Sequence, residues 1–163
     1  MSTKRDRYTF ENNVSIPPAI AKVVADLLRQ WDNCHDTDHN YLKCFAEDAT
    51  LNLAPNSATG HHAIRDMRNY AIHPERGLIT ACQHTLHRLY ILAGDQPGQG
   101  VNVAFTSRVE YTIGGKPYPE EFSTTFDLVG NEKKGYVVKY ARIYLDNVNI
   151  GKAMSELVPN ATA

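Results

Sequence analysis

The sequence has little of several features that mark specialised classes of protein. It contains three cysteines in 163 residues and no paired C-x-x-C spacing, which disfavours a disulfide scaffold and a structural zinc site. No apolar run approaches the ~18 residues of a membrane span, and no apolar signal region follows the charged start. With 17 basic and 18 acidic residues, no excess of charge favours nucleic acid. We expect a soluble cytoplasmic protein with Cys34, Cys44 and Cys82 as reduced core thiols.

Catalytic motifs with a fixed spacing are missing as well. The chain has no G-x-S-x-G elbow, no phosphate-binding glycine loop and no dinucleotide fingerprint, so serine hydrolases, kinases and dehydrogenases lack their required parts. Adjacent histidines on a helix point in different directions, and no carboxylate lies at a matched ligand spacing to the five histidines His35, His39, His61, His62 and His73. We therefore predict no metal site, and cofactor-free chemistry is the enzymatic possibility that remains.

The length and composition suit one globular domain. At 42% apolar and 21% charged residues, the chain is long enough to bury a sizeable core. We predict an N-terminal arm over residues 1–14, a single α+β domain over residues 15–150 and a C-terminal tail over residues 151–163. Tyr8 and Phe10 are expected to hold the arm against the body of the protein or against a partner subunit.

Helical patterns come first along the chain and strand patterns come last. Apolar residues at helical spacing from Ile20 to Trp31 predict a first helix behind two prolines, Tyr41, Leu42 and Phe45 mark a short second helix, and residues 61–72 form a third. A short strand over 49–53 and a loop over 55–60 are followed by four long strands at about 80–92, 101–113, 120–129 and 136–146, joined by hairpin-like turns. This order predicts an α+β fold in which about three N-terminal helices close a pocket against a curved antiparallel sheet.

Several short strings carry a resemblance to a known superfamily. They are Trp31, Asp36-Thr-Asp38, Tyr41-Leu-Lys-Cys-Phe-Ala-Glu-Asp-Ala49, Gly60-His-His-Ala-Ile-Arg65 and Gln83-His84. Together with the order of elements, they resemble the SnoaL-like branch of the nuclear transport factor two-like superfamily over roughly residues 16–147. The resemblance implies a cone-shaped α+β fold. Dehydratases, isomerases, cyclases, epoxide hydrolases and non-catalytic proteins share that fold, so it does not settle the function.

Within the superfamily, the nearest enzymatic resemblance is to scytalone dehydratase, a cofactor-free lyase with a paired Asp and His in its cone. Asp36 and His84 fall at the matching places when one residue is deleted after Asp36, and Arg108 stands where that enzyme has a second pocket histidine. The resemblance implies a lyase or isomerase that acts on a hydrophobic oxygenated metabolite of polyketide or terpenoid type. Arg108-Val-Glu110 also resembles part of the epoxide hydrolase site, but Ile143 stands where those enzymes carry a second Asp, so epoxide hydrolysis ranks lower.

A histidine opposite a carboxylate in an apolar cavity can remove a proton and return it. We predict that His84 is the acid/base, that Asp36 orients its imidazole or assists as a second base, and that Arg108 stabilises a developing oxyanion. The alternative is that His84 is a hydrogen-bonded core residue, Asp36 a helix or turn cap and Arg108 an exposed partner of Glu110 or Glu121. At the level of the whole protein, the alternative function is a non-catalytic module for ligand binding or assembly.

Other side chains are candidates for substrate binding, because aromatic rings combine apolar area with a polar handle. The predicted substrate-binding residues are Trp31, Tyr41, Phe45, Met67, Tyr144 and Glu110, although aromatic residues of this kind also serve simply as core. Strict alternation from His84 would send Leu86, Arg88 and Tyr90 to the same face.

We also predict a homodimer that forms through the outer face of the sheet. The predicted strands 101–113 and 120–129 place alternating apolar side chains on this face, more than a monomer usually leaves exposed to water. They are Phe105, Val109, Tyr111, Phe122 and Phe126.

Overall fold

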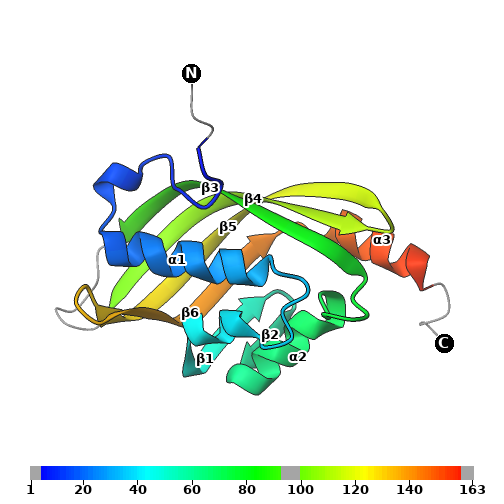
Figure 1. Cartoon of the computed structure of the whole chain (residues 1–163), viewed down its shortest axis with the longest axis horizontal. Helices are drawn as coiled ribbons and strands as arrows, with labels where there is room; N and C mark the ends of the chain where they lie inside the picture. Colours follow the sequence, from blue (N-terminus) through cyan, green and yellow to red (C-terminus); the bar gives the residue numbers. More distant parts are fainter. Residues whose placement is uncertain (1–4, 93–99, 159–163) are drawn as a thin grey trace.

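The protein consists of a strongly curved sheet whose inner side is covered by helices (Figure 1). The structure is a computed structural model that describes residues 5–92 and 100–158. The helices are α1 (Pro18–Trp31), α2 (His61–Ala71) and α3 (Val148–Leu157), with 3-10 helices η1 (Asn13–Ser15) and η2 (Asn40–Cys44). The strands are β1 (Phe45–Leu53), β2 (Asn56–Thr59), β3 (Ile79–Leu92), β4 (Val101–Ile113), β5 (Lys116–Asn131) and β6 (Gly135–Leu145).

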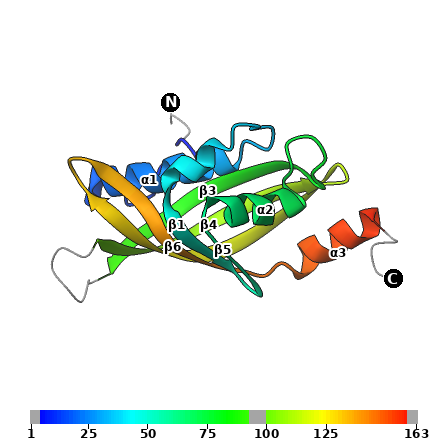
Figure 2. The ribbon, with the colours of Figure 1, turned by 90° about the horizontal axis from the view of Figure 1, so that it is seen from below.

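The described strands form one six-stranded sheet in the order β2-β1-β6-β5-β4-β3. The predicted α+β class is confirmed, and the four long strands β3 to β6 pair antiparallel in succession. The sheet as a whole is mixed, because β1 pairs with β6 in parallel. Residues 55–60, predicted to be a loop, contain β2, which pairs with β1 as a short hairpin. Figure 2 shows that α3 extends from one end of the sheet, away from α1 and α2.

Helix α1 forms the main cover of the sheet. Pro18 stands at its first turn, where a missing N–H costs nothing, and the buried residues Ile20, Val23, Val24, Leu27 and Leu28 recur at helical spacing along one face. The helix ends at Trp31, and Asp32 follows as the C-cap, with its backbone N–H donating to the carbonyl of Leu28 at 2.9 Å. The carboxylate of Asp32 therefore leaves the helix at the end that lies beside β3.

The apolar residues of β4 and β5 lie on the inner face of the sheet, and not on the outer face as predicted. The side chains of Val103, Phe105 and Val109 are buried within the core, and Phe122 and Phe126 lie with them. The apolar side chains predicted to form an outer dimer face therefore point inward. The homodimer itself stays a prediction.

A register shift in β3 explains a second difference. Cys82, His84 and Leu86 are buried in alternation, but pairing with β4 slips between Leu86 and Leu89, so that Leu89 is buried next. The side-chain amide of Asn12 bonds both the N–H and the carbonyl of Leu89, at 3.1 and 2.7 Å. Arg88 and Tyr90 consequently face outward, which corrects their predicted placement on the face of His84.

The N-terminal segment lies along the edge strand β3. Phe10 is buried and meets Phe105 edge to face, with ring centroids 6.0 Å apart, while Tyr8 packs against the core and reaches the end of α1. None of the helices in the described part of the chain is long and apolar enough to cross a membrane.

We predict that Phe105→Ala lowers the free energy of unfolding by about 3–5 kcal/mol, because it removes the ring that contacts Phe10, Phe122 and Phe126 in the core. The matched control is Thr106→Ala on the opposite, exposed face, expected within about 0.5 kcal/mol of the wild type. Urea unfolding measures both. Equal effects of the two substitutions would mean that this face assignment is wrong.

Candidate active site

A mostly apolar cavity lies between α1 and the inner face of the sheet. Its empty volume is about 580 Å³, part of which is open solvent at the mouth. The polar side chains in its wall are His84, Thr124, Tyr111 and the indole of Trp31. The remaining lining residues are apolar: Leu27, Leu28, Phe45, Leu51, Leu53, Phe105, Phe122, Phe126, Ala141, Ile143 and Leu145. Among the described residues, no Lys, Arg, Asp or Glu lines the cavity, so its wall suits an uncharged ligand.

His84 is held from behind by a buried carboxylate. Its Nδ1 lies 2.5 Å from Oδ1 of Asp32, and both side chains are about 95% buried, with 6% and 5% of their surface exposed. The imidazole also packs edge to face against the ring of Phe122, with centroids 5.3 Å apart. Within the described part of the chain, Nε2 has no hydrogen-bond partner. The ring thus presents a free nitrogen in a residue that lines the cavity.

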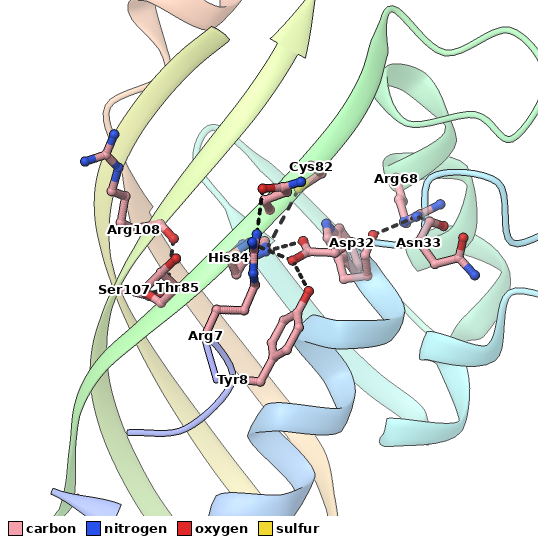
Figure 3. A network of polar contacts seen from close by, with 12 residues as sticks. Arg7, Tyr8, Asp32, Asn33, Arg68, Cys82, His84, Thr85, Ser107 and Arg108 are labelled. Atoms are coloured by element: carbon pink, nitrogen blue, oxygen red, sulfur yellow. Dashed lines mark hydrogen bonds and ion pairs between the residues drawn. The ribbon is translucent and has the colours of Figure 1, made fainter. Parts of the chain in front are cut away.

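The contacts of Asp32 assign the proton between the two side chains. Oδ2 accepts the backbone N–H of His84 at 2.6 Å and the hydroxyl of Tyr8 at 2.8 Å (Figure 3). Two donors on Oδ2 mean that this oxygen carries no proton, so the proton of the third contact lies between Oδ1 and Nδ1. We assign it to Nδ1 of His84, because an imidazole is ordinarily a stronger base than a carboxylate. In the neutral form of the ring with the proton on Nδ1, Nε2 is a lone-pair base, which is the tautomer needed for proton abstraction.

The groups around Asp32 are protonated. Burial, followed by the charge of Asp32 and the hydrogen bond to it, raises the pKa of the Tyr8 phenol, so Tyr8 remains a donor. Burial and the charge of Asp32 also raise the pKa of the Cys82 thiol well above its usual value. Tyr111 follows the same pattern, with burial as the main cause of its raised pKa and Cys82 and Asp32 as further causes. Tyr8, Cys82 and Tyr111 are therefore neutral neighbours of the carboxylate.

Asp32, Cys82 and His84 are also the described residues that come closest to a metal-ligand set, since one donor atom of each lies within 4.8 Å of the others. The sulfur of Cys82 lies 3.9 Å from Nδ1 of His84. However, the 2.5 Å between Nδ1 and Oδ1 is shorter than the roughly 3 Å that separates two ligands on one zinc ion at normal bond lengths. Cys82 would also have to lose the proton that burial retains. The geometry fits a hydrogen-bonded acid/base pair better than a metal centre.

The five histidines set aside as metal ligands do not gather at this site. Four of them contact separate groups: His35 the carbonyl of Pro74, His61 that of Phe45, His62 the carboxylate of Asp66, and His73 the N–H of Glu75. The fifth, His39, has a left-handed backbone, and its ring meets Tyr41 edge to face.

Arg68 of α2 fixes the turn that carries Asp32. Only 2% of this residue is exposed, and its guanidinium donates to the carbonyls of Trp31 and Asn33 at 2.8 and 3.1 Å and to that of Ile72 at 3.1 Å. The charge lies over the rings of Trp31 and Tyr41, 5.4 and 4.6 Å from their centroids. Because Trp31 and Asn33 flank Asp32, Arg68 holds the backbone on both sides of the carboxylate.

The expected pairing of His84 with Asp36 is corrected by the structure. Asp36 is a buried turn cap: Oδ1 accepts the N–H of Asp38 and the side-chain amide of Asn40, both at 3.0 Å, and Oδ2 accepts the N–H of Asn40 at 2.5 Å. Its oxygens are thereby committed to its own turn. Asp32, four residues earlier, occupies the place beside the imidazole.

Arg108 and Glu110, predicted to lie in the pocket, are outside it. They face away from the cavity on β4 and form an exposed ion pair at 3.7 Å, with 48% and 45% of their side chains accessible. Arg108 therefore lies on the opposite side of the sheet from the imidazole, where it cannot stabilise an oxyanion in the cavity. A strand presents alternate residues to opposite faces, and Val109 is the member of this trio that is buried.

The predicted substrate-binding residues divide into two groups. Trp31 and Phe45 line the cavity. Tyr41 is fully buried beneath Arg68, Met67 packs against the core, and neither belongs to the cavity wall, while Tyr144 is 60% exposed on the outer side. Burial raises the pKa of Tyr41 to about 12, so its phenol stays neutral.

Four residues that make this site are not among the site residues predicted from the sequence. Asp32 carries a usable signal, because an acidic residue directly after the last turn of a helix opposes the helix dipole and calls for a compensating contact. Thr124 and Tyr111 could be found only from the register of β4 and β5, which places them on the inner face with Phe122. Tyr8 gave no positional signal, because its partner Asp32 is 24 residues away along the chain.

Comparisons with known proteins agree on the fold. No family model matches the sequence, and no curated protein matches it. Among solved structures, LinA has a TM-score of 0.65 at 14% identity, over 78% of this chain and 84% of LinA. The CaMKII hub of S. rosetta has a TM-score of 0.60 at 16% identity, over 78% and 95% of the two chains. Nuclear transport factor 2 from Cryptosporidium parvum has a TM-score of 0.56 at 16% identity, over 81% and 98%. At these identities the likeness shows the cone fold of nuclear transport factor 2, as predicted, and nothing more.

We predict that Arg68→Met lowers the free energy of unfolding by about 2–4 kcal/mol, because three carbonyls lose their donor in a buried place. Arg65→Met is the matched control one helical turn earlier, since Arg65 is partly exposed and pairs only with neighbouring Asp66 among the described residues. Thermal and urea unfolding compare the two variants. A loss for Arg68→Met no larger than that for Arg65→Met would contradict the assigned role.

Proposed function

We propose that this protein is a cofactor-independent lyase or isomerase that acts by acid/base catalysis on a neutral, hydrophobic, oxygenated metabolite. The observation that carries the proposal is the buried Asp32–His84 pair, whose imidazole lines an apolar cavity. His84 is the acid/base at Nε2, and Asp32 holds the Nδ1–H tautomer and stabilises the imidazolium that forms during turnover.

The proposed reactions need one proton to move between the substrate and Nε2 of His84. Nε2 of His84 removes a proton from a carbon next to a carbonyl group, and the electron pair of the broken C–H bond forms a double bond. In a dehydration, the neighbouring C–O bond breaks and the leaving oxygen takes the proton back from Nε2, so that one water molecule departs. In an isomerisation, the same proton returns to a different carbon. Both courses leave His84 neutral at the end.

The cavity wall supports the class of substrate. Its apolar side chains can enclose a ring-bearing molecule, and the lining residues Tyr111 and Thr124 can bond its oxygen atoms. A polyketide or terpenoid skeleton with a carbonyl group and a hydroxyl group meets these requirements, in line with the resemblance noted from the sequence. Epoxide hydrolysis fits less well, because Arg108 and Glu110 lie outside the cavity and Ile143 lines it.

The experiment that tests the proposal is a screen for proton exchange. A panel of neutral hydrophobic ketones and hydroxyketones is incubated with the protein in D₂O, and deuterium uptake and loss of water are followed by mass spectrometry. We expect a wild-type hit whose turnover falls by roughly 100-fold or more in His84→Ala and in Asp32→Asn.

Asp36→Asn is the matched control, because it makes the same carboxylate-to-amide change in a buried residue that lies away from the cavity wall. The amide keeps one of the two acceptor oxygens of the turn, so the fold of this variant is checked by urea unfolding. Its turnover should stay close to that of the wild type. Ligand binding with no exchange would favour the non-catalytic binding module instead. Turnover that survives His84→Ala would overturn the catalytic role of His84.

A second prediction concerns Thr124, which is 1% exposed, lines the cavity and has a hydroxyl with no partner among the described residues. Thr124→Val should raise the free energy of unfolding of the empty protein by about 1 kcal/mol, because an unpaired hydroxyl is costly to bury. The same variant should bind the screened hit more weakly, as calorimetry would show. A destabilised variant with unchanged affinity would rule out a ligand-binding hydroxyl.

A further inference from the structure

We propose that Tyr8 is a positioning residue of the active site, brought to Asp32 by an N-terminal segment that pairs with the edge of the sheet. This inference rests on the function proposed above. The segment consists here of residues 5–12, and Tyr8 reaches the site from outside the cavity wall.

The segment is registered against β3 by backbone contacts. The N–H of Leu86 donates to the carbonyl of Arg7 at 2.8 Å, and the N–H of Glu11 donates to the carbonyl of His87 at 2.7 Å. The guanidinium of Arg5 adds a bond to the carbonyl of Leu86 at 3.1 Å. Since β3 is an edge strand of the sheet, these contacts satisfy groups that an open edge would leave unpaired. They also fix the position of Tyr8 along β3, and so its place relative to His84.

Helix α1 contacts the same segment through the side chain of Arg29. The guanidinium of Arg29 lies 4.8 Å from the centre of the Tyr8 ring and 3.6 Å from the carboxylate of Asp6. Phe10, two residues after Tyr8, is buried against Phe105. Tyr8 is thus fixed by contacts to α1, β3 and the core before its hydroxyl makes any bond, so that the hydroxyl is preorganised for its acceptor.

The acceptor is Oδ2 of Asp32, at 2.8 Å. The other donor to that oxygen is the backbone N–H of His84, at 2.6 Å. Two donors on Oδ2 lock the rotation of the carboxylate and leave Oδ1 aimed at Nδ1 of His84. Oδ1 is then the acceptor that faces the Nδ1–H of His84, at 2.5 Å. Without the hydroxyl, only the backbone N–H of His84 would hold Oδ2, and the contact between Oδ1 and Nδ1 would change.

Tyr8 does not belong to the cavity wall, so its effect has to pass through Asp32. Turnover should therefore depend on the hydroxyl while substrate affinity does not. The same prediction distinguishes Tyr8 from a residue that simply stabilises the fold, because loss of stability changes neither the proton of His84 nor kcat of the molecules that remain folded.

The test is Tyr8→Phe, which removes one oxygen atom. Protein labelled with 15N at histidine gives the resonances of Nδ1, Nε2 and the Nδ1-bound proton of His84, assigned by their absence in His84→Gln. We expect Tyr8→Phe to shift the Nδ1-bound proton and Asp32→Asn to shift it further. Tyr41→Phe, which removes another buried phenol oxygen with no partner among the described residues, should leave it in place. With a substrate from the screen, kcat should fall by about tenfold at constant KM, as expected for one hydrogen bond to a charged group.

An unshifted His84 proton in Tyr8→Phe, alongside a shift in Asp32→Asn, would overturn the role assigned to Tyr8. A raised KM at unchanged kcat would also overturn it and make Tyr8 a binding residue. The resonance is read without substrate, so failure of the proposed function, seen as turnover that survives Asp32→Asn, is a separate result.

Discussion

The burial of one carboxylate organises the helical side of this protein. An ionised carboxyl group that is removed from water destabilises the fold unless donors replace the lost hydration. Asp32 receives three donors, from the backbone N–H of His84, from its imidazole and from Tyr8. These donors come from β3 and from the N-terminal segment, whereas Asp32 itself ends α1. Docking of the helix on the sheet and assembly of the acid/base pair are consequently the same event.

Asp32 adds negative charge to the C-terminal end of α1, and Arg68 compensates this charge. The C-terminal end of a helix carries partial negative charge, and a buried carboxylate at the C-cap adds to it. The guanidinium of Arg68 lies against this helix end, bonded to the carbonyls of Trp31 and Asn33. A buried cation is thereby matched to a helix end and a carboxylate without a direct ion pair, and the carboxylate keeps its oxygens for His84 and Tyr8.

The sequence predicts the elements of this fold better than it predicts their contacts. The apolar spacing of α1 and the long strand patterns give the α+β class, because each depends on local periodicity. The mixed sheet could not be read in this way, since the parallel pairing of β1 with β6 joins segments some 90 residues apart along the chain. His84 was found because it stands in a recognisable string, but its partner was assigned by alignment to Asp36, a residue whose own turn uses both of its oxygens. Arg108 was misplaced because one step of strand register exchanges the two faces.

The turn from Trp31 to Asn33 links the cavity to the acid/base pair. The side chain of Trp31 forms part of the cavity wall, its carbonyl is held by Arg68, and the next residue is the carboxylate that holds His84. Arg68 also lies over the Trp31 ring, so the ring and the backbone that follows it share one anchor. A ligand that packs against the indole would therefore contact the same turn that positions the imidazole. In such a site the shape of the apolar cavity and the geometry of proton transfer are set by one group of contacts, and a substitution that loosens the turn changes both.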